Sequence, residues 1–255
     1  MVDQEYIHYF SHGTAIHGMQ DLDPNKPEMR RVPLLYFSRS GPLGEAIGWL
    51  PNELKHHVAV VGLGAGAMAC YAEAGQHWTF YEIDPEVARI ASDPRYFTFL
   101  KDSPGDTKLV LGDGRLSLQS APDGQYETMI LDAYTSDTPP LHLLTREALA
   151  LYVRKLAPNG VIIFNITNRH LDLEPVLANL ARDAKLYSLC RIDFVSNEEH
   201  ARSGAGSAWW LVMTRNTQYL DLLARDNRWR LPQPQRGVGV WSDDFTSVFT
   251  IFHWD

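Results

Sequence analysis

The fold of this chain is decided by one stretch, which reads Val58-Ala59-Val60-Val61-Gly62-Leu63-Gly64-Ala65-Gly66-Ala67. Its first four residues are apolar without alternation, which is typical of a strand that is buried on both faces of a parallel sheet. The glycines that follow permit a tight turn and a close approach of the backbone to a ligand. The stretch therefore predicts a central strand that ends in a ligand-binding loop.

Apolar strands and helices alternate through the rest of the chain. Further strands are expected at 78–81, 108–111, 128–131, 161–164, 186–192 and 209–213. Helices are expected from the glycine loop to residue 74, from Asp84, from Thr145 to 156 and from 173 to 184, with Asp84 and Thr145 as N-caps. This order predicts an α/β fold with a doubly wound, mostly parallel sheet. Ligands bind such sheets beyond the carboxyl ends of the strands, so functional residues should follow the strands.

The glycine loop fits two ligand-binding patterns. Gly62, Gly64 and Ala67 fit the dinucleotide pattern GxGxxG/A. Gly62, Gly64 and Gly66 fit the GxGxG loop of S-adenosyl-methionine-dependent transferases. The loop alone does not separate the two classes.

Acidic residues after the next two strands help to separate them. Glu82 ends the strand expected at 78–81, and an acid about 20 residues after the glycines binds ribose hydroxyls in either class. Asp113 and Gly114 follow the strand expected at 108–111. An acid there meets the adenine amine in adenosyl-sulfonium transferases and has no counterpart in the dinucleotide pattern. The structural alternative is that Asp113 caps a helix that begins near Arg115.

A turn-rich loop, Asp132-Ala133-Tyr134-Thr135-Ser136-Asp137-Thr138-Pro139-Pro140, leaves the strand expected at 128–131. Because Asp, Ser and Pro favour turns, it also has a purely structural interpretation. A pair of carboxylates facing a reactive sulfonium would suit an amine substrate, since carboxylates hold ammonium groups and accept the proton that the amine must lose. An alkyl ammonium resembles lysine, with a pKa of about 10.4, so deprotonating it at neutral pH costs about 4–5 kcal/mol.

Together these motifs resemble the spermidine synthase (polyamine aminopropyltransferase) family. The residues that carry the resemblance are 16–20, 60–66, 81–85, 112–115 and 131–134. The loop after Asp132, followed by His142-Leu143-Leu144-Thr145, is similar to a bacterial spermidine-synthase-like branch that includes proteins fused to membrane segments. The resemblance covers nearly the whole chain. It implies a sheet of the S-adenosyl-methionine-dependent methyltransferase type with a small N-terminal β appendage.

The resemblance also implies roles for individual residues. The residues implied to hold decarboxylated S-adenosyl-methionine, or its product methylthioadenosine, are Gln20, Gly62, Gly64, Gly66, Glu82, Asp113 and Gly114. Asp132 is implied to be the catalytic acid that activates the amine. Tyr36, Tyr134 and Asp137 are implied to contact the amine substrate.

At the amine site the chain departs from the family pattern. Asp132 and Asp137 stand farther apart than the usual Asp-x-x-Asp, and the usual Tyr-His-Glu is replaced by Tyr36-Phe37-Ser38, which removes one partner for an ammonium group. A late segment, Val240-Trp241-Ser242-Asp243-Asp244-Phe245, would restore acidity if Asp243 and the aromatic face of Trp241 closed over a cation. The alternative is a loop with a packed tryptophan.

Residues 1–57 are expected to form a small N-terminal β segment with a connecting helix, and residues 58–255 the catalytic domain. The N-terminal strands are expected at 6–10 and 34–37, with a loop at 21–31 and a helix ending at Leu50. The segment is shorter than the hairpin domain of the family. The chain is therefore expected to be a cytoplasmic protein or the cytoplasmic domain of a membrane-attached parent. The resemblance also implies a homodimer as an expected form of the protein.

Composition restricts the partners. The chain is 45% hydrophobic and has a formal net charge of −8. Nucleic-acid-binding proteins usually carry a basic face, so this balance argues against a nucleic-acid partner and is compatible with a cationic small substrate. Cys70 and Cys190 stand alone in apolar settings and are expected to be reduced core residues. The spacing of His12, His17 and His142 matches no closed metal site, so no metal is expected.

The leading hypothesis is transfer of an aminopropyl group from decarboxylated S-adenosyl-methionine, as a co-substrate, to a polyamine acceptor such as putrescine. Two alternatives stay open. One is a methyltransferase that uses intact S-adenosyl-methionine, and the other is a non-catalytic nucleoside-binding domain that has lost the amine site. A nucleotide-dependent dehydrogenase has no place for Asp113 or the Asp132 loop.

Overall fold

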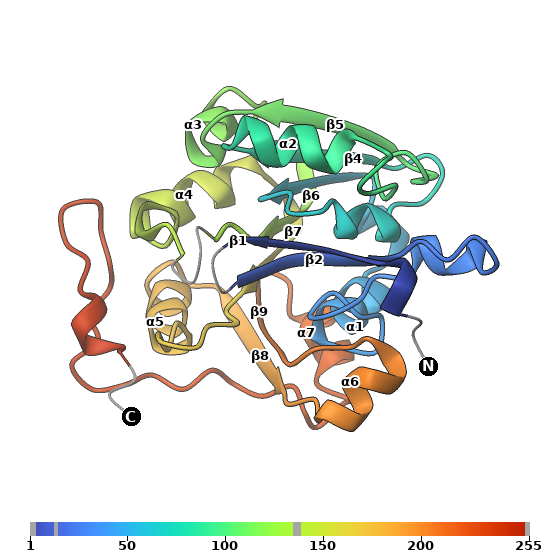
Figure 1. Cartoon of the computed structure of the whole chain (residues 1–255). Helices are drawn as coiled ribbons and strands as arrows, with labels where there is room; N and C mark the ends of the chain where they lie inside the picture. Colours follow the sequence, from blue (N-terminus) through green and yellow to red (C-terminus); the bar gives the residue numbers. More distant parts are fainter. Residues whose placement is uncertain (1–3, 13–14, 135–138, 253–255) are drawn as a thin grey trace.

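The computed structural model describes residues 4–12, 15–134 and 139–252. Within these residues a central seven-stranded sheet has the strand order β5-β4-β3-β6-β7-β9-β8 (Figure 1). Its strands are β3 (His57–Val61), β4 (His77–Glu82), β5 (Asp106–Leu111), β6 (Tyr126–Leu131), β7 (Leu156–Asn165), β8 (Tyr187–Asp193) and β9 (Ala208–Thr214). Strands β3 to β7 are parallel, and β9 runs antiparallel to both β7 and β8. The predicted mostly parallel sheet is confirmed.

Helices cover both faces of the sheet. One hydrophobic core is shared with α1 (Pro42–Trp49), α2 (Pro85–Ser92) and α7 (Thr217–Leu223), and the other with α3 (Gly114–Gln119), α4 (Arg146–Lys155) and α5 (Glu174–Asp183). Helix α6 (Asn197–Ser203) precedes β9. Along β3, Val58 and Val60 pack in the first core, whereas Ala59 and Val61 pack in the second. This double burial explains why the strand is apolar throughout.

Short 3₁₀ helices complete the described chain. They are η1 (Gln4–Tyr6), η2 (Pro27–Arg31), η3 (Asn52–Leu54), η4 (Ala67–Tyr71), η5 (Leu141–Leu143) and η6 (Val248–Thr250). The helix expected from the glycine loop to residue 74 is only the single turn η4, because Ala72 already adopts an extended conformation. Strand β7 begins earlier than expected, because Leu156 pairs with Tyr126 before the register shifts.

A separate antiparallel hairpin is formed by β1 (Ile7–His12) and β2 (Ala15–Asp21). The expected second strand at 34–37 was wrong, since Leu35 forms only an isolated bridge with Ala205 and residues 36–37 lie in a turn. The pattern at 15–21 is weakened by Gly18, because glycine disfavours a strand interior. A Cβ on Gly18 would lie 2.3 Å from the Cβ of Ala65, so the glycine lets the hairpin pack directly on the glycine loop.

The first helix belongs to the core of the large sheet. Leu43 and Ile47 of α1 pack in the same hydrophobic core as Val60. The division of the chain at residue 57 stays a prediction. Cys70 and Cys190 are free and buried, as expected.

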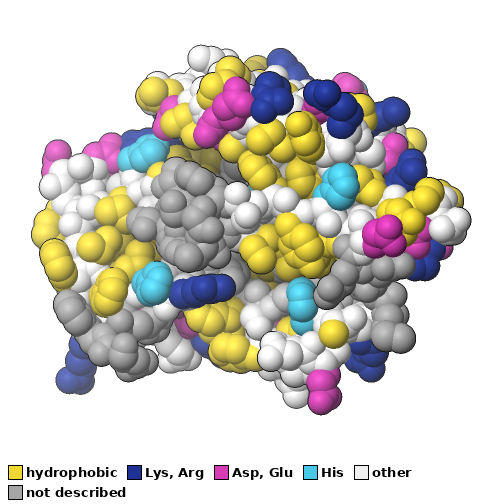
Figure 2. All heavy atoms as spheres, in the orientation of Figure 1, with side chains coloured by type: hydrophobic (Ala, Val, Ile, Leu, Met, Phe, Trp, Pro, Cys, Tyr) yellow, Lys and Arg dark blue, Asp and Glu magenta, His cyan; other side chains and the backbone are white. Residues whose placement is uncertain are grey.

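Two further features concern the outer surface. On the face shown in Figure 2, hydrophobic side chains gather near the centre, while charged side chains lie mostly towards the edge. None of the helices in the part of the chain that the structure describes has the length and apolarity needed to span a bilayer.

Candidate active site

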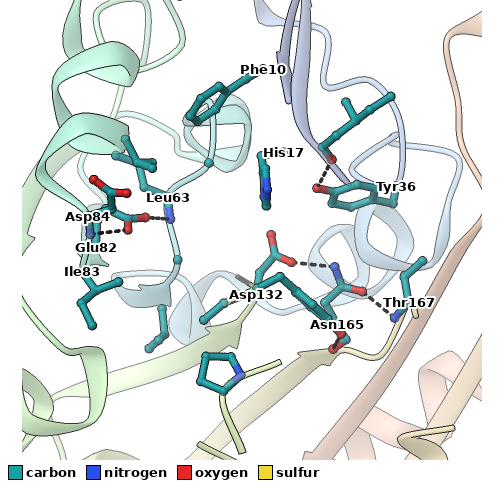
Figure 3. A pocket seen from close by; sticks show the side chains of 18 of the residues that line it. Phe10, His17, Tyr36, Leu63, Glu82, Ile83, Asp84, Asp132, Asn165 and Thr167 are labelled. Carbon is teal, nitrogen blue, oxygen red and sulfur yellow. Dashed lines mark hydrogen bonds between the residues drawn. The ribbon is translucent and has the colours of Figure 1, made fainter. Parts of the chain in front are cut away.

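A cavity of about 850 Å³ lies at the carboxyl ends of the parallel strands. It is lined by Gly62 after β3, Glu82 at the end of β4, Asp113 after β5 and Asp132 after β6, with Asn165 at the end of β7. Strands β4 and β6 flank β3, so the cavity lies where the strand order reverses, which is the usual ligand position in such sheets. The acids that were expected to meet therefore line one cavity, and Figure 3 shows Phe10 and His17 of the hairpin on its opposite wall.

The glycine loop is shaped by close backbone contacts. Gly62 has a φ of +100°, and a Cβ there would lie 2.2 Å from the carbonyl oxygen of Asp132. Gly64 has a φ of +54°, and its Cβ would lie 2.4 Å from the carbonyl oxygen of His17. Glycine alone tolerates both the conformation and the contact. Gly66 caps η4 and, unlike the other two, does not line the cavity.

The Glu82 carboxylate is fixed by two main-chain groups. Its Oε2 accepts a hydrogen bond from the Leu63 amide (3.0 Å), and its Oε1 accepts one from the Asp84 amide (2.8 Å) (Figure 3). A carboxylate offers about four lone-pair sites, so two remain for hydroxyl donors. The side chain therefore presents a preorganised acceptor to the cavity.

The Asp113 carboxylate has two partners as well. Its Oδ1 accepts a hydrogen bond from the Leu116 amide (2.8 Å) and so caps α3. Its Oδ2 lies 2.9 Å from Nε2 of His142, which also lines the cavity. The helix-cap and ligand-site interpretations of Asp113 are thus compatible, and Gly114 lines the cavity beside it. His142 was not among the predicted site residues.

The carboxyl group of Asp132 has a raised pKa. Burial raises its pKa to about 7, and a hydrogen bond from Nδ2 of Asn165 to Oδ1 (2.6 Å) opposes this rise. Among the described residues no hydrogen-bond partner is found for its Oδ2, and Figure 3 shows the carboxylate pointing into the cavity towards His17. Near pH 7 such a group can either accept or donate a proton.

Asn165 was not among the predicted site residues, although it directly follows the strand expected at 161–164. Phe164 pairs with Leu131 in the register of β7 and β6, so the next residues, Asn165 and Asp132, lie side by side. The amide is oriented because the Thr167 N–H donates to its Oδ1 (2.9 Å), which leaves the NH₂ group facing the carboxylate. The rule that polar residues after strands are functional would have identified it.

The two predicted tyrosines line the cavity with their hydroxyls tied to the backbone. The Tyr36 hydroxyl donates to the Ile16 carbonyl (3.0 Å), and the Tyr134 hydroxyl donates to the Asn165 carbonyl (2.9 Å). Burial raises the pKa of both phenols well above the usual value. They are therefore neutral walls of the site and not proton acceptors.

The structure does not bring Gln20 to the cavity. Its side chain is completely buried and has three partners, because Nε2 donates to the Arg30 carbonyl and to Oγ1 of Thr98, while Oε1 accepts from the Thr98 amide. The prediction that Gln20 contacts the ligand is therefore corrected. Its side chain has a structural role and links the hairpin to Thr98.

The late acidic segment does not reach the cavity either. Trp241 is 1% exposed and packs in the core, as the alternative interpretation expected. Asp243 forms a salt bridge with Arg115 (2.7 Å) and accepts a hydrogen bond from Oγ1 of Thr145 (2.8 Å). The predicted contact of Trp241 and Asp243 with an amine is thus corrected. Asp137 lies outside the described residues.

The remaining wall was not found from the sequence. It is formed by Thr167, Asn168, Arg169, Gly206, Ser207 and Trp209. Trp209 and Trp210 begin the strand expected at 209–213, where a buried apolar strand is the simple interpretation. This holds for Trp210, which is fully buried, but Trp209 lines the cavity.

The fold is an α/β fold of the S-adenosyl-methionine-dependent methyltransferase type. A crystal structure of a probable spermidine synthase from Corynebacterium glutamicum ATCC 13032 has this fold, with a TM-score of 0.63, 16% identity, and coverage of 97% of this chain and 93% of that chain. No protein-family model matches the sequence.

Two curated relatives narrow the class. The chain is 34% identical over 154 residues to a polyamine aminopropyltransferase of Vibrio vulnificus (strain CMCP6), which covers 58% of this chain and 48% of the relative. It is 29% identical over 112 residues to a probable polyamine aminopropyl transferase of Bifidobacterium longum (strain NCC 2705), covering 42% and 23%. The match thus spans about half the length of the first relative and less of the second. Over the matched residues the chain is therefore similar in sequence to polyamine aminopropyltransferases, as the motifs indicated.

Proposed function

We propose that this chain transfers an aminopropyl group from decarboxylated S-adenosyl-methionine to an amine, with putrescine as the reference acceptor. The observation that carries the proposal is the Asp132 carboxyl group, with its pKa of about 7, in the same cavity as Glu82 and Asp113. The names of the two curated relatives support the type of reaction.

The nucleoside end would be held by the first strand-end acids. Glu82 has free lone pairs for ribose hydroxyls, and Asp113 lies where it can accept from the adenine amine. Ile83 lines the cavity and is 59% exposed, so it offers an apolar surface for the base. The glycine loop allows the ligand to approach the backbone closely.

The chemistry needs a base and correct placement. The amine nitrogen attacks the propyl carbon beside the sulfonium, so a C–N bond forms and the C–S bond breaks. The electron pair of that bond returns to sulfur, which gives neutral methylthioadenosine, and the ammonium proton passes to Asp132. Proton transfer from an ammonium of pKa about 10.4 to an ordinary aspartate is uphill by about 9 kcal/mol, but only by about 5 kcal/mol when the aspartate pKa is about 7. The leaving group needs no acid, because it departs as a neutral thioether.

Calorimetry and a product assay test the proposal. Decarboxylated S-adenosyl-methionine and methylthioadenosine are expected to bind more tightly than intact S-adenosyl-methionine, and putrescine to release methylthioadenosine. Preference for the intact ligand with methyl transfer would replace this function by a methyltransferase. Tight nucleoside binding without turnover on any amine would indicate a binding domain.

The variant Asp132→Asn isolates the catalytic step. It is expected to lower kcat by about 10²–10⁴, the usual contribution of a general base, and to leave nucleoside affinity unchanged. Asp183→Asn, which breaks the Arg146 ion pair outside the cavity, is the matched control. A loss of nucleoside affinity in Asp132→Asn would show that this residue holds the ligand instead.

A further inference from the structure

The charges of the cavity are divided unevenly between its two ends. Four lining acids come from the ends of β4 and β5 and from the start of α2: Glu82, Asp84, Glu86 and Asp113. On the side formed by Tyr36, the end of β7 and the start of β9, Asp132 is the sole acid among the described lining residues. That same side carries the one Lys or Arg side chain of the described lining, which is Arg169.

Arg169 is exposed, and its guanidinium group makes no polar contact that would stabilise the described part of the fold. In the described part of the chain no hydrogen bond or ion pair is found for its guanidinium group. Three arginines elsewhere in the described chain, Arg115, Arg146 and Arg230, each pair with a carboxylate. A guanidinium without a partner at a ligand cavity remains available for an anion.

The backbone around Arg169 is nevertheless held in place. The Asn168 side chain is 6% exposed, and its Oδ1 accepts from the amides of His170 (2.8 Å) and Leu171 (2.8 Å). Thr167 exchanges two hydrogen bonds with the backbone of Trp209, at 2.9 and 3.3 Å. The loop therefore holds Arg169 at a defined position on the side of the cavity formed by Tyr36, the end of β7 and the start of β9, which we call the acceptor side.

This arrangement disfavours a diamine. A diamine whose first ammonium meets Asp132 carries a second cation towards the guanidinium, and like charges repel at short range. A carboxylate in that place would match the planar fork of an arginine with two parallel hydrogen bonds. The segment Tyr36-Phe37-Ser38 supplies no acid, since Phe37 is 3% exposed in the core and Ser38 bonds to Ser40.

We propose, on the basis of the proposed function, that the acceptor is an amino carboxylate: its ammonium group meets Asp132 and its carboxylate binds Arg169. The reaction is unchanged in its balance. The C–N bond forms at the acceptor nitrogen, the sulfonium C–S bond breaks with its electron pair on sulfur, and the proton passes to Asp132. The product is an N-(3-aminopropyl) amino carboxylate together with methylthioadenosine.

Matched acceptor pairs test this proposal. Putrescine is compared with 4-aminobutanoate, and 1,5-diaminopentane with 5-aminopentanoate, by kcat/KM for methylthioadenosine release. The wild-type protein is expected to prefer the better amino carboxylate over its matched diamine by at least tenfold. Arg169→Glu is expected to lower that kcat/KM by about 100-fold and to reverse the preference. Arg225→Glu, an exposed arginine that does not line the cavity, should change neither value. A wild-type preference for diamines, or an unchanged ratio in Arg169→Glu, overturns the proposal.

A binding measurement separates this proposal from the proposed function. Acceptors are titrated by calorimetry into protein saturated with methylthioadenosine. If no acceptor is turned over, the proposed function fails, but tighter binding of the amino carboxylate that is lost in Arg169→Glu still supports the acceptor class. If Arg169→Glu weakens intact S-adenosyl-methionine and leaves amino carboxylate binding unchanged, Arg169 serves the donor and the acceptor class is refuted.

Discussion

Replacing Asn165 by leucine should move the pH dependence of the reaction upward. Asn165 donates a 2.6 Å hydrogen bond to Asp132, and this bond lowers a pKa that burial has raised to about 7. Leucine has a similar size but offers no donor. Without the hydrogen bond, the ionised carboxylate loses its main stabilising contact, so its pKa must rise further.

The magnitude follows from the strength of that bond. A hydrogen bond to a charged group contributes about 1.5–3 kcal/mol, which corresponds to about 1–2 pKa units. The pKa of Asp132 should therefore rise from about 7 to about 8–9. At pH 7 the ionised fraction falls from about one half to between about one tenth and one hundredth, so the rate should fall about 5–50-fold.

The assay is methylthioadenosine release between pH 6 and 9.5, expressed as kcat/KM for the acceptor. In the wild-type protein the profile should rise with the Asp132 pKa of about 7 and fall near the acceptor pKa of about 10.4. The variant should lose activity at pH 7 and recover most of it at pH 9.5. Asn197→Leu, an exposed position on α6, controls for the substitution itself. An equal loss at every pH, or an acid limb that stays at 7, would refute the assigned role of Asp132.

Three further predictions concern stability and binding. The folded protein holds the Asp132 proton more tightly than the unfolded chain, so ionisation of this carboxyl group lowers the free energy of unfolding as the pH rises from about 4 to 7. Asp132→Asn should therefore increase the free energy of unfolding at pH 8 by up to about 4 kcal/mol. Urea unfolding that shows the same gain at pH 5 would contradict this. Glu82→Gln should weaken methylthioadenosine binding by about tenfold or more, because hydrogen bonds to a charged acceptor are replaced by weaker ones, and unchanged calorimetric affinity would exclude Glu82 from the site. Asp243→Asn should leave the acceptor KM unchanged. It should lower the free energy of unfolding by about 1 kcal/mol at most, because Asp243 is partly exposed although its partner Arg115 is largely buried. A raised KM would show that Asp243 belongs to the amine site after all.

The sheet and the acids of the cavity could be predicted because both depend on local sequence. Each central strand is a short apolar run, and parallel strands end at the same edge of the sheet. A residue at the end of such a strand or within two positions after it, as Glu82, Asp113 and Asp132 are, must therefore lie near the others. The hairpin was predicted less well, because Gly18 weakens the strand pattern for a tertiary reason, its contact with Ala65.

Other residues could not be placed because their surroundings come from distant parts of the chain. Gln20 is buried by its hydrogen bonds to Thr98, 78 positions away, and Asp243 is neutralised by Arg115, 128 positions away. Neither contact leaves a local pattern. A motif that resembles a ligand contact therefore becomes a site residue only when its side chain also lines the cavity, as Glu82 and Asp113 do and as Gln20 and Asp243 do not.

The two ends of the cavity differ in how closely they are tied to the fold. At the proposed nucleoside end, Glu82 binds two main-chain amides and Asp113 caps α3, so a change there should disturb both the structure and the proposed ligand contact. At the acceptor end, Arg169 makes no hydrogen bond or ion pair with described residues, so its replacement should change affinity without changing the melting temperature. If the proposed function holds, acceptor specificity can therefore diverge by single substitutions while the proposed nucleoside site is retained. Comparing Glu82→Gln with Arg169→Gln by thermal unfolding without ligand tests this difference, because only the former should melt at a lower temperature.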